Sequence, residues 1–378
     1  MKEGWEYKKL EEVCEILDSQ RKPITKGKRE SGSIPYYGAT GCLDYVKDYI
    51  FNEKLVLLGE DGAKWGAGEN SAYIINGKSW VNNHAHTLRP KRDLLVDELL
   101  VYYLNYSNLL SYITGVTVPK LNQEKMRSIE IPIGPLSEQQ SIVEYLDSAF
   151  AKIDAMKANA EKALNEAKAL FQASLKEMLE PKEGWEYKKL KEVGVTQTGT
   201  TPSKQIKAYY GGDIPFIRPA ELNIDQNGGI QYDSELKLTE EGALKTRVIK
   251  ANSVLMCCIG SVGKTGFALN NVTCNQQINT LTPYENYNPR FVYYALISPI
   301  FQQEVIKIAN SAKATLPIIS KGKWEMLSIP VPPLSEQQSI VATLDSLKSK
   351  VARLQANSDK ISQECDALKQ AILRQVFE

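Results

Sequence analysis

The sequence has little of what catalysis, metal binding or secretion usually requires. It contains two histidines, His84 and His86, and its six cysteines form no C-x-x-C pair or regular framework. Such cysteines favour reduced thiols in an intracellular protein over a secreted disulfide scaffold. No N-P-P-Y-like, G-x-S-x-G or H-E-x-x-H motif is present, so methyltransferase, serine hydrolase and zinc protease signatures are missing. We therefore expect no catalytic centre in this chain.

The chain also lacks a charge excess and a long hydrophobic run. Its 46 basic residues face 45 acidic ones, so bulk charge neither requires nor excludes a nucleic-acid partner. No segment approaches the roughly 18 uncharged residues of a membrane span, and the N-terminal MKEGWEYKKL has no apolar core. We expect a soluble, cytoplasmic protein with no membrane partner.

What the sequence does contain is an internal repeat. KEGWEYKKLEEV at 2–13 returns as KEGWEYKKLKEV at 182–193, and PLSEQQSIVEYLD at 135–147 returns as PLSEQQSIVATLD at 333–345. Each copy therefore has a nearly fixed start, a divergent middle and a nearly fixed tail. This arrangement is expected if the middle selects something and the tail holds something common to both copies.

Both copies of the second phrase predict the start of a long helix. The motif S-x-x-Q, an N-terminal capping box, begins at Ser137 and at Ser335, and no glycine or proline interrupts 138–179 or 336–377. Apolar residues then recur in alternating steps of four and three, the heptad pattern of a coiled coil. The predicted seam contains Ile142, Leu146, Ile153, Met156, Leu170, Ile340, Leu344, Leu347, Val351, Leu354, Ile361, Leu368 and Ile372, with Ala149, Ala160, Ala163 and Ala167 between them in the first helix.

The divergent middles predict two mixed α/β domains, because short apolar runs punctuated by Gly, Pro and Asn alternate with segments of helical spacing. The predicted organisation is a first domain at 1–134, a spacer helix at 135–181, a second domain at 182–332 and a second spacer helix at 333–378. The fold class is therefore α+β with a pseudo-two-fold internal repeat.

One motif suggests nucleotide chemistry. GSVGKTG at 260–266 resembles a phosphate-binding loop, but Cys258 stands where a Walker A loop requires glycine. The aligned GEDGAKWG of the first copy places Asp61 where it would repel a phosphate. We favour a tight glycine-rich turn, and a P-loop enzyme remains an alternative.

The two histidines suggest a metal site. His84 and His86 could share one face of a strand as ligands. Their aligned partners are Gln277 and Asn279, which keep hydrogen-bonding ability but not metal affinity, and no third ligand is visible. We predict no metal site, and a polar contact or a structural role for both side chains.

Taken together, these features resemble the specificity subunit of a Type I restriction-modification system across essentially the whole chain. The resemblance rests on the duplicated GWEYKKL starts, the entries IPIGPLSEQQ and IPVPPLSEQQ into the long helices, and the loops TGVTVPKLNQEKMRSIEIP and NSAKATLPIISKGKWEMLSIP. It implies two target-recognition domains, each reading one half of a split double-stranded DNA sequence, separated by two helices that form an antiparallel coiled coil.

The resemblance also implies partners. These are two modification (methyltransferase) subunits and restriction (translocase and nuclease) subunits, which would hold S-adenosylmethionine, ATP and Mg. This chain would then be non-catalytic and carry no cofactor. A coiled-coil scaffold without DNA binding is the other alternative, and it would not explain the divergent middles.

For base reading we favour the divergent loops, since Arg and Lys suit guanine edges and Asn and Gln suit adenine. The candidates of the first domain are Lys64, Trp65, Asn82, Asn83, His84, His86, Thr117 and Lys120. Those of the second domain are Arg218, Lys264, Asn275, Gln276, Gln277, Lys313 and Thr315. A basic cluster of Arg21, Lys22, Lys26, Lys28 and Arg29 suits either a solvated loop or phosphate contact. Tyr36, Tyr37 and Phe216 are expected to pack inside the domains.

Overall fold

The computed structural model describes residues 4–115, 117–222, 234–311 and 316–378. It divides into two compact units, one formed by 1–159 with 360–378 and the other by 160–359. Two long helices, α4 (Leu136–Met178) and α10 (Leu334–Phe377), each contribute to both units. Each unit therefore combines one globular domain with a segment of both helices.

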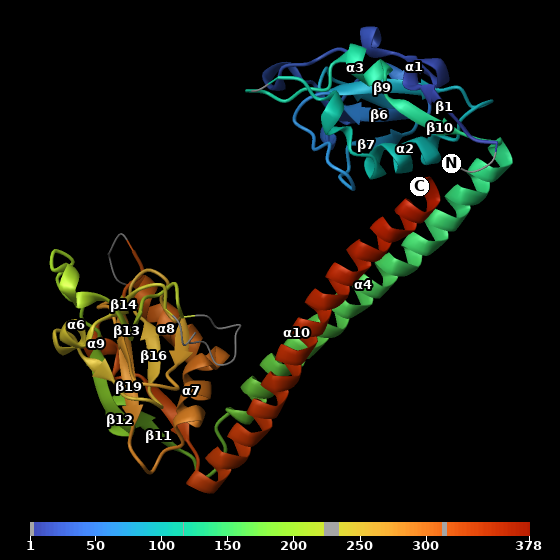
Figure 1. The fold of residues 1–378 in the computed structure, drawn as a ribbon. Coiled ribbons are helices and arrows are strands. Elements are labelled where there is room, and N and C mark those ends of the chain that lie inside the picture. The colour runs from blue at the N-terminus through green and yellow to red at the C-terminus, as the bar shows by residue number, and fades with distance from the viewer. Residues whose placement is uncertain (1–3, 116, 223–233, 312–315) are drawn as a thin grey trace. The chain divides into compact units, whose positions relative to one another are not determined.

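Three small sheets build the first domain (Figure 1). Strand β1 (Glu6–Lys9) pairs antiparallel with β10 (Glu130–Ile133), and the two four-stranded sheets have the orders β2-β9-β6-β7 and β4-β3-β8-β5. The other strands are β2 (Cys14–Ile16), β3 (Ser31–Gly38), β4 (Gly41–Val46), β5 (Phe51–Asn52), β6 (Leu55–Gly59), β7 (Ala72–Ile75), β8 (Lys78–Val81) and β9 (Ala85–Pro90). The helices are α1 (Leu10–Val13), α2 (Asp97–Tyr106) and α3 (Gln123–Arg127), with the 3-10 turns η1 (Asp18–Gln20), η2 (Lys26–Lys28) and η3 (Leu109–Tyr112).

The second domain repeats this topology strand for strand. Its sheets have the orders β11-β20, β12-β19-β16-β17 and β14-β13-β18-β15. The strands are β11 (Glu186–Lys189), β12 (Gly194–Thr198), β13 (Tyr210–Ile217), β14 (Lys237–Leu238), β15 (Val248–Ile249), β16 (Val254–Cys257), β17 (Thr265–Phe267), β18 (Val272–Cys274), β19 (Ile278–Pro283) and β20 (Ser328–Val331). The helices are α5 (Leu190–Val193), α6 (Glu240–Leu244), α7 (Pro289–Ile297), α8 (Pro299–Ser311) and α9 (Lys321–Trp324), with the 3-10 turn η4 (Lys207–Tyr209). The predicted internal repeat and the α+β class are confirmed.

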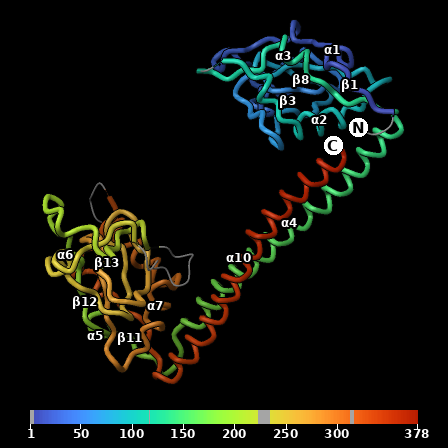
Figure 2. Tube along the Cα trace, in the orientation of Figure 1, coloured from blue at the N-terminus to red at the C-terminus, as the bar shows by residue number. Residues whose placement is uncertain are grey.

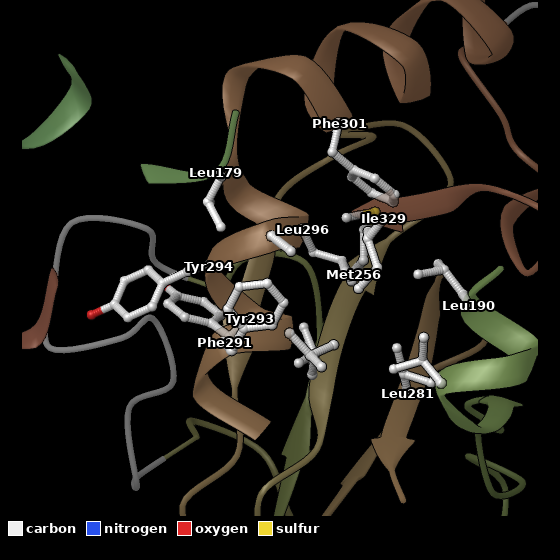
Figure 3. Packing of buried hydrophobic residues seen from close by; sticks show 14 of the residues in the cluster. Leu179, Leu190, Met256, Leu281, Phe291, Tyr293, Tyr294, Leu296, Phe301 and Ile329 are labelled. Atoms are coloured by element: carbon white, nitrogen blue, oxygen red, sulfur yellow. The ribbon is translucent and has the colours of Figure 1, made fainter. Parts of the chain in front are cut away.

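Continuous apolar runs form the central strands of these domains. LVLLG of β6 and VLMC of β16 are buried at every position, as expected for strands with neighbours on both sides and cover on both faces. In the second unit, helix α7 packs Phe291, Tyr293 and Tyr294 against β16 and against Leu179, just beyond the end of α4 (Figure 3). Each domain thus buries its own core.

The two long helices run antiparallel. In the first unit Lys369 Nζ lies 2.6 Å from Asp154 Oδ1, and Lys157 Nζ lies 3.3 Å from Asp366 Oδ1, so numbers rise along one helix as they fall along the other. In the second unit Lys168 donates to Gln355 Oε1 at 2.8 Å. The trace in Figure 2 shows the helices side by side. The antiparallel pairing implied by the resemblance is confirmed.

The register of the predicted seam is wrong at four positions, Met156, Ala163, Leu170 and Leu368, all of which are exposed. Met156, Leu170 and Leu368 are 57%, 57% and 48% exposed. Of the other predicted positions, Leu146, Ile153, Ile340 and Leu344 are buried, and Ile142, Leu347, Val351, Leu354, Ile361 and Ile372 are partly buried.

In α4 the less exposed positions are Lys157, Leu164 and Phe171 instead of Met156, Ala163 and Leu170, while Ala149 and Phe150 are both partly buried. Candidate residues stand next to each other at these points, so spacing alone did not select the register. For Leu164 and Phe171 the larger apolar side chain turns inward, because it buries more apolar area.

The repeated phrase does not form the predicted capping box. Helix α4 begins at Leu136, so Ser137 lies within its first turn. Instead Gln139, fully buried, accepts the Val96 N–H at 3.0 Å and donates to the Leu94 carbonyl oxygen at 2.8 Å. In the second copy Gln337 accepts the Asn288 N–H at 2.9 Å. In each unit this glutamine fastens the domain to the start of its long helix.

Two further ties recur in both units. The indole N–H of Trp5 donates to Glu138 at 2.9 Å, and that of Trp185 donates to Glu336 at 3.2 Å. The hydroxyl groups of Tyr102 and Tyr294 donate to Asp147 and Asp345, respectively. Much of the repeated sequence is therefore explained by packing of each domain on its own helix.

Candidate nucleic-acid interface

Three loops of the first domain meet at one place. The loop after β6, the β8-β9 connection and the segment 114–121 are joined by backbone hydrogen bonds. Glu60 N–H donates to the His84 carbonyl oxygen at 2.9 Å, Leu121 N–H donates to the Glu60 carbonyl oxygen at 2.8 Å, and Thr114 and Lys120 bond to each other at 2.8 Å in both directions. Three loops from the divergent middle of the repeat therefore form a single cluster.

Five of the predicted base-reading residues are accessible at this cluster. The side chains of Lys64, His84 and Lys120 are 80%, 51% and 44% exposed, and Asn83 and Thr117 are exposed as well. They offer donors and acceptors of the kinds that contact base edges and phosphates. Their contact with DNA stays a prediction.

Three other predicted residues of the first domain lie in its interior. Trp65 is 5% exposed and donates to the Gly59 carbonyl oxygen at 2.9 Å. Asn82 is 3% exposed, and its Oδ1 accepts the His84 N–H at 2.8 Å, which shapes the turn. His86 is fully buried. Without an accessible side chain these residues cannot touch bases in this conformation, and we correct their assignment to supporting positions.

His86 lies in a buried network of charged groups. Its Nδ1 is 2.6 Å from Asp18 Oδ2, and its Nε2 is 2.7 Å from the Leu121 carbonyl oxygen. Arg21 donates to Glu60 and to the Ala85 carbonyl oxygen, and it lies 3.2 Å from Asp18. These contacts connect η1, the loop after β6 and the segment before α3.

Both carboxylates of this network are held ionised. Burial opposes ionisation of Asp18, but hydrogen bonds from His86 and the Thr87 N–H, with the charge of Arg21, outweigh it and lower the pKa of Asp18. Burial likewise opposes ionisation of Glu60, and hydrogen bonds from Lys120 and Arg21 lower the pKa of Glu60. The network is therefore an assembly of paired charges.

Asp18, Glu60 and His86 place ligand atoms within 4.8 Å of one another, a grouping that could hold a metal ion. The carboxylate oxygens already have cationic partners, however, because Arg21 pairs with both carboxylates and Lys120 Nζ lies 2.8 Å from Glu60. The geometry fits an ion-pair network that supports the loops.

Arg21 is the residue that sequence reasoning assigned to the wrong role. Its side chain is 11% exposed, and Arg29 donates to Asp44 at 2.9 Å while stacking 4.3 Å from the Tyr36 ring centroid. The other members of the basic cluster, Lys22, Lys26 and Lys28, are exposed. The sequence analysis did not predict a role for Asp18 or Glu60, because isolated acidic residues carry no periodic signal.

The aromatic residues expected to pack inside the domains do so. Tyr36 and Phe216 are buried, and the Tyr37 ring centroid lies 6.0 Å from that of Tyr73.

The second domain builds the same loop cluster. Cys258 N–H donates to the Gln277 carbonyl oxygen at 2.7 Å, and Ile319 N–H donates to the Cys258 carbonyl oxygen at 2.9 Å. Asn275, 9% exposed, accepts the Gln277 N–H at 3.1 Å and so repeats the turn of Asn82. Asn275 is corrected to a turn-forming position, while Gln276 is exposed and Gln277 is partly exposed.

Two basic residues predicted for the second cluster are already engaged. Arg218 donates to Glu221 and, at 2.9 Å, to Glu235, and the hydrogen bond to Glu221 is the largest cause of its raised pKa. Lys264 donates to the Pro219 carbonyl oxygen at 2.8 Å. The predicted residues Lys313 and Thr315 lie outside the described residues.

The GSVGKTG motif is not a phosphate-binding loop in this structure. It connects the antiparallel strands β16 and β17, whereas a P-loop leads from a strand into a helix. Gly260 and Gly263 have φ of 81° and 89°, the left-handed conformation that this turn requires and that favours glycine. The motif is a hairpin turn, and the P-loop alternative has no structural support.

Comparison with known proteins agrees with this architecture. A family model described as the Type I restriction modification DNA specificity domain matches residues 2–166 and 182–363. A putative type I restriction enzyme specificity subunit of Haemophilus influenzae is 28% identical over 348 residues, with 91% of this chain and 88% of the relative covered. The EcoR124I/EcoR124II specificity subunit of Escherichia coli is 32% identical over 233 residues, with 59% and 55% covered.

Solved structures share the fold. The HsdS subunit of Thermoanaerobacter tengcongensis aligns with a TM-score of 0.60 at 20% identity, with 100% of this chain and 97% of that chain covered. A chain from a study of complex assembly and conformational transition of the type I R-M system aligns with a TM-score of 0.71 at 20% identity, with 100% and 98% covered. Among the described residues, no helix is long and apolar enough to cross a bilayer.

Proposed function

The chain belongs to the Type I restriction-modification DNA specificity family, and on that premise we propose that it selects the DNA target of such a complex, with each domain reading one half of a bipartite sequence. One observation supports this most directly. The same three-loop cluster is built twice on the same strands, while the exposed side chains differ, His84 and Lys120 in one copy against Gln277 and Ile318 in the other. Of these four side chains His84 is 51% and Lys120 44% exposed, whereas Gln277 and Ile318 are partly exposed. A common scaffold with different side chains is what two unlike half-sites require.

We further propose that the chain itself performs no chemistry and works in the cytoplasm. Methyl transfer from S-adenosylmethionine, and ATP- and Mg-dependent translocation and cleavage, would belong to modification and restriction subunits. The support is the side-chain inventory, since the tempting motif at 260–266 is a hairpin turn and the buried histidine serves an ion-pair network.

The repeated phrase offers two equivalent docking places for two modification subunits. Leu136 and Leu334 are 39% and 41% exposed, and the exposed Gln140 and Gln338 stand at matching positions. Ser137, Glu138, Ser141 and Ile142 line a hollow of about 320 Å³. Packing within each unit does not explain why exposed residues are the same in both copies, and two identical partners would.

We also propose that the length of the paired helices sets the number of base pairs between the half-sites. Four residues inserted near Ala163 would lengthen one helix by about 6 Å, close to two base pairs at roughly 3.4 Å each. The prediction is a longer spacer in the methylated target, although the unchanged partner helix will absorb part of the extension. An active variant with the original spacer would refute this proposal.

The central test exchanges residues 14–131 for the matching region of a relative. We expect one half of the methylated sequence to change and the other to stay, as read by methylome sequencing of cells that carry the chain and its modification subunit. A change in both halves would show that the domains do not read independently.

The docking proposal has its own test. Gln140→Arg and Gln338→Arg should each reduce the number of bound modification subunits from two to one, measured by mass photometry, and the double variant should bind none. Lys162→Arg, on an exposed part of α4 outside the repeated phrase, is the matched control. The alternative of a scaffold without DNA binding has a separate test. If it holds, the complex of the unsubstituted chain with its modification subunits should enrich no sequence from random double-stranded DNA.

A further inference from the structure

The hydrogen bonds of His86 define its protonation state. Its two ring nitrogens face Asp18 Oδ2 at 2.6 Å and the Leu121 carbonyl oxygen at 2.7 Å. A backbone carbonyl can only accept, and the Asp18 carboxylate already accepts the Thr87 N–H at 2.9 Å and the Gln123 side-chain amide at 3.1 Å. A neutral imidazole carries one N–H and would leave a lone pair facing an oxygen. Both ring nitrogens must therefore carry hydrogen.

Charged groups surround this hydrogen-bonded ring. Asp18 and Glu60 lie 2.6 Å and 3.7 Å from His86 Nδ1, and Arg21 pairs with both carboxylates, with Lys120 on the outer side of Glu60. The side chains of Asp18, Glu60 and Arg21 are at most 11% exposed, while that of Lys120 is 44% exposed. Two buried carboxylates beside the ring favour a positively charged imidazole in this network.

We propose that His86, as an imidazolium, is a positioning residue that holds the reading loops of the first domain, and that the second domain achieves the same end without a charge. His86 joins η1 to Leu121, the residue after Lys120, and it lies on β9 two residues after His84. It touches no DNA itself and acts through the placement of its neighbours. The inference rests on the proposed function in one respect, the assumption that these loops face DNA.

The second domain has neutral residues at the three equivalent positions. Pairing of the strands places Thr198 opposite Asn279, and Cys258 follows β16 as Glu60 follows β6. Thr198 donates to Asn279 Oδ1 at 2.8 Å, and Asn279 Nδ2 donates to Cys258 Sγ at 3.2 Å. These hydrogen bonds join neutral side chains, so only the first domain supports its loops with charged groups at these positions.

Spectroscopy tests the protonation state without any DNA. The chain has two histidines, so a full-length His84→Asn variant labelled with ¹⁵N-histidine gives the ring signals of one imidazole. We expect both ring nitrogens to have the shifts of an imidazolium at pH 7, with ring N–H protons that exchange slowly because the side chain is buried. The spectrum of a neutral tautomer at that pH would overturn the inference.

Half-site selection tests the positioning role. The full chain and its His86→Gln variant, each with the modification subunits, select from random double-stranded DNA. Glutamine carries no charge at this place, so preference at the first half-site should fall on the order of tenfold for the loss of one charged hydrogen bond. Preference at the second half-site should stay constant.

Two variants separate positioning from folding. Asp18→Thr/Arg21→Thr/Glu60→Cys/His86→Asn installs the neutral residues of the second domain, which has Thr198, Thr201, Cys258 and Asn279 at these positions. This variant should recover part of the first half-site preference that His86→Gln loses, provided circular dichroism shows an intact fold. Asn279→Ala is the matched change in the second domain and should lower preference at the second half-site alone. Equal losses at both half-sites in His86→Gln, or in Asn279→Ala, would overturn the positioning role. If the unmodified complex selects no sequence, the proposed function fails, while the spectrum still decides the charge of His86.

Discussion

The two domains share their strand order and differ in how they support the same loop cluster. In the first domain Asp18, Glu60 and His86 meet with Arg21 as a buried set of charges. In the second domain a hydroxyl, a thiol and an amide occupy the equivalent places. A backbone can therefore be kept while its polar interior is rebuilt, provided every buried donor and acceptor finds a partner.

The difference also affects how much stability each domain loses when one member of its set is removed. Charged hydrogen bonds are stronger than neutral ones, but removing one partner leaves an uncompensated buried charge. The neutral set loses less when one member is removed. The first domain should thus be the more sensitive of the two to mutation and to pH.

The largest expected difference comes from removing one member of each set. Asp18→Ala should destabilise the first domain by about 3–5 kcal/mol, because His86 and Arg21 lose a buried counter-charge. Thr198→Ala should cost the second domain about 1 kcal/mol, the contribution of one neutral hydrogen bond. Hydrogen exchange read by mass spectrometry in increasing urea reports each domain separately, with Asp48→Ala at an exposed site as control. Equal losses would show that the charged and neutral sets are energetically alike.

Acid should give the second-largest difference in stability between the two domains. The lowered pKa values of Asp18 and Glu60 mean that their stabilising effect is present above their unfolded values, near 3.9 and 4.3, and is lost as pH falls through the lower folded values. In the second domain the lowered carboxyl pKa values belong to Glu186 and Glu325 among the described residues, of which Glu186 is exposed and Glu325 is partly exposed. Between about pH 5 and about pH 3 the first domain should lose exchange protection first. The variant that carries the neutral residues of the second domain, Asp18→Thr/Arg21→Thr/Glu60→Cys/His86→Asn, should abolish that order. Unfolding of the second domain first would contradict the comparison.

The repeated glutamines should respond alike in both units. Gln139→Ala and Gln337→Ala should each cost about 1–3 kcal/mol, because a buried N–H and a buried carbonyl are left without partners. The matched controls are Gln140→Ala and Gln338→Ala, whose side chains are exposed. The readout is local exchange at Val96 and Asn288, which donate to these glutamines. A large effect in only one unit would mean that the two ties are not equivalent.

Thiol reactivity should give the smallest contrast. Burial raises the pKa of Cys258 and Cys274 to about 12, so their thiolate fractions at pH 8 are small, whereas Cys42 of the first domain is exposed. Iodoacetamide should label Cys42 quickly in the folded chain and label the second domain only after urea is added. Rapid labelling of Cys258 in the native chain would show that the neutral set opens readily.

Much of the fold could be predicted from the sequence. Repeated phrases and matched helix lengths are local features, and they gave the two copies, the two helices and the α+β class. Sequence spacing failed where neighbouring residues competed, as with Ala163 and Leu164, since only contact with α10 decides which one turns inward. The alignment of the two copies pointed to the loops that form the cluster. It could not show that His84 is exposed while His86, two residues away, is buried.

The sequence by itself determined that the chain is one unit built twice, because periodicity and duplication need no tertiary information. Only the tertiary structure decided which polar residues are buried and support the loops, and which are exposed at the loop cluster. Asp18, Glu60 and His86 come from η1, the loop after β6 and β9, and they meet because three strand ends converge. A side chain's role in such a network depends on the partners that folding places beside it, since a buried charge is stable only where an opposite charge and hydrogen-bond partners lie beside it.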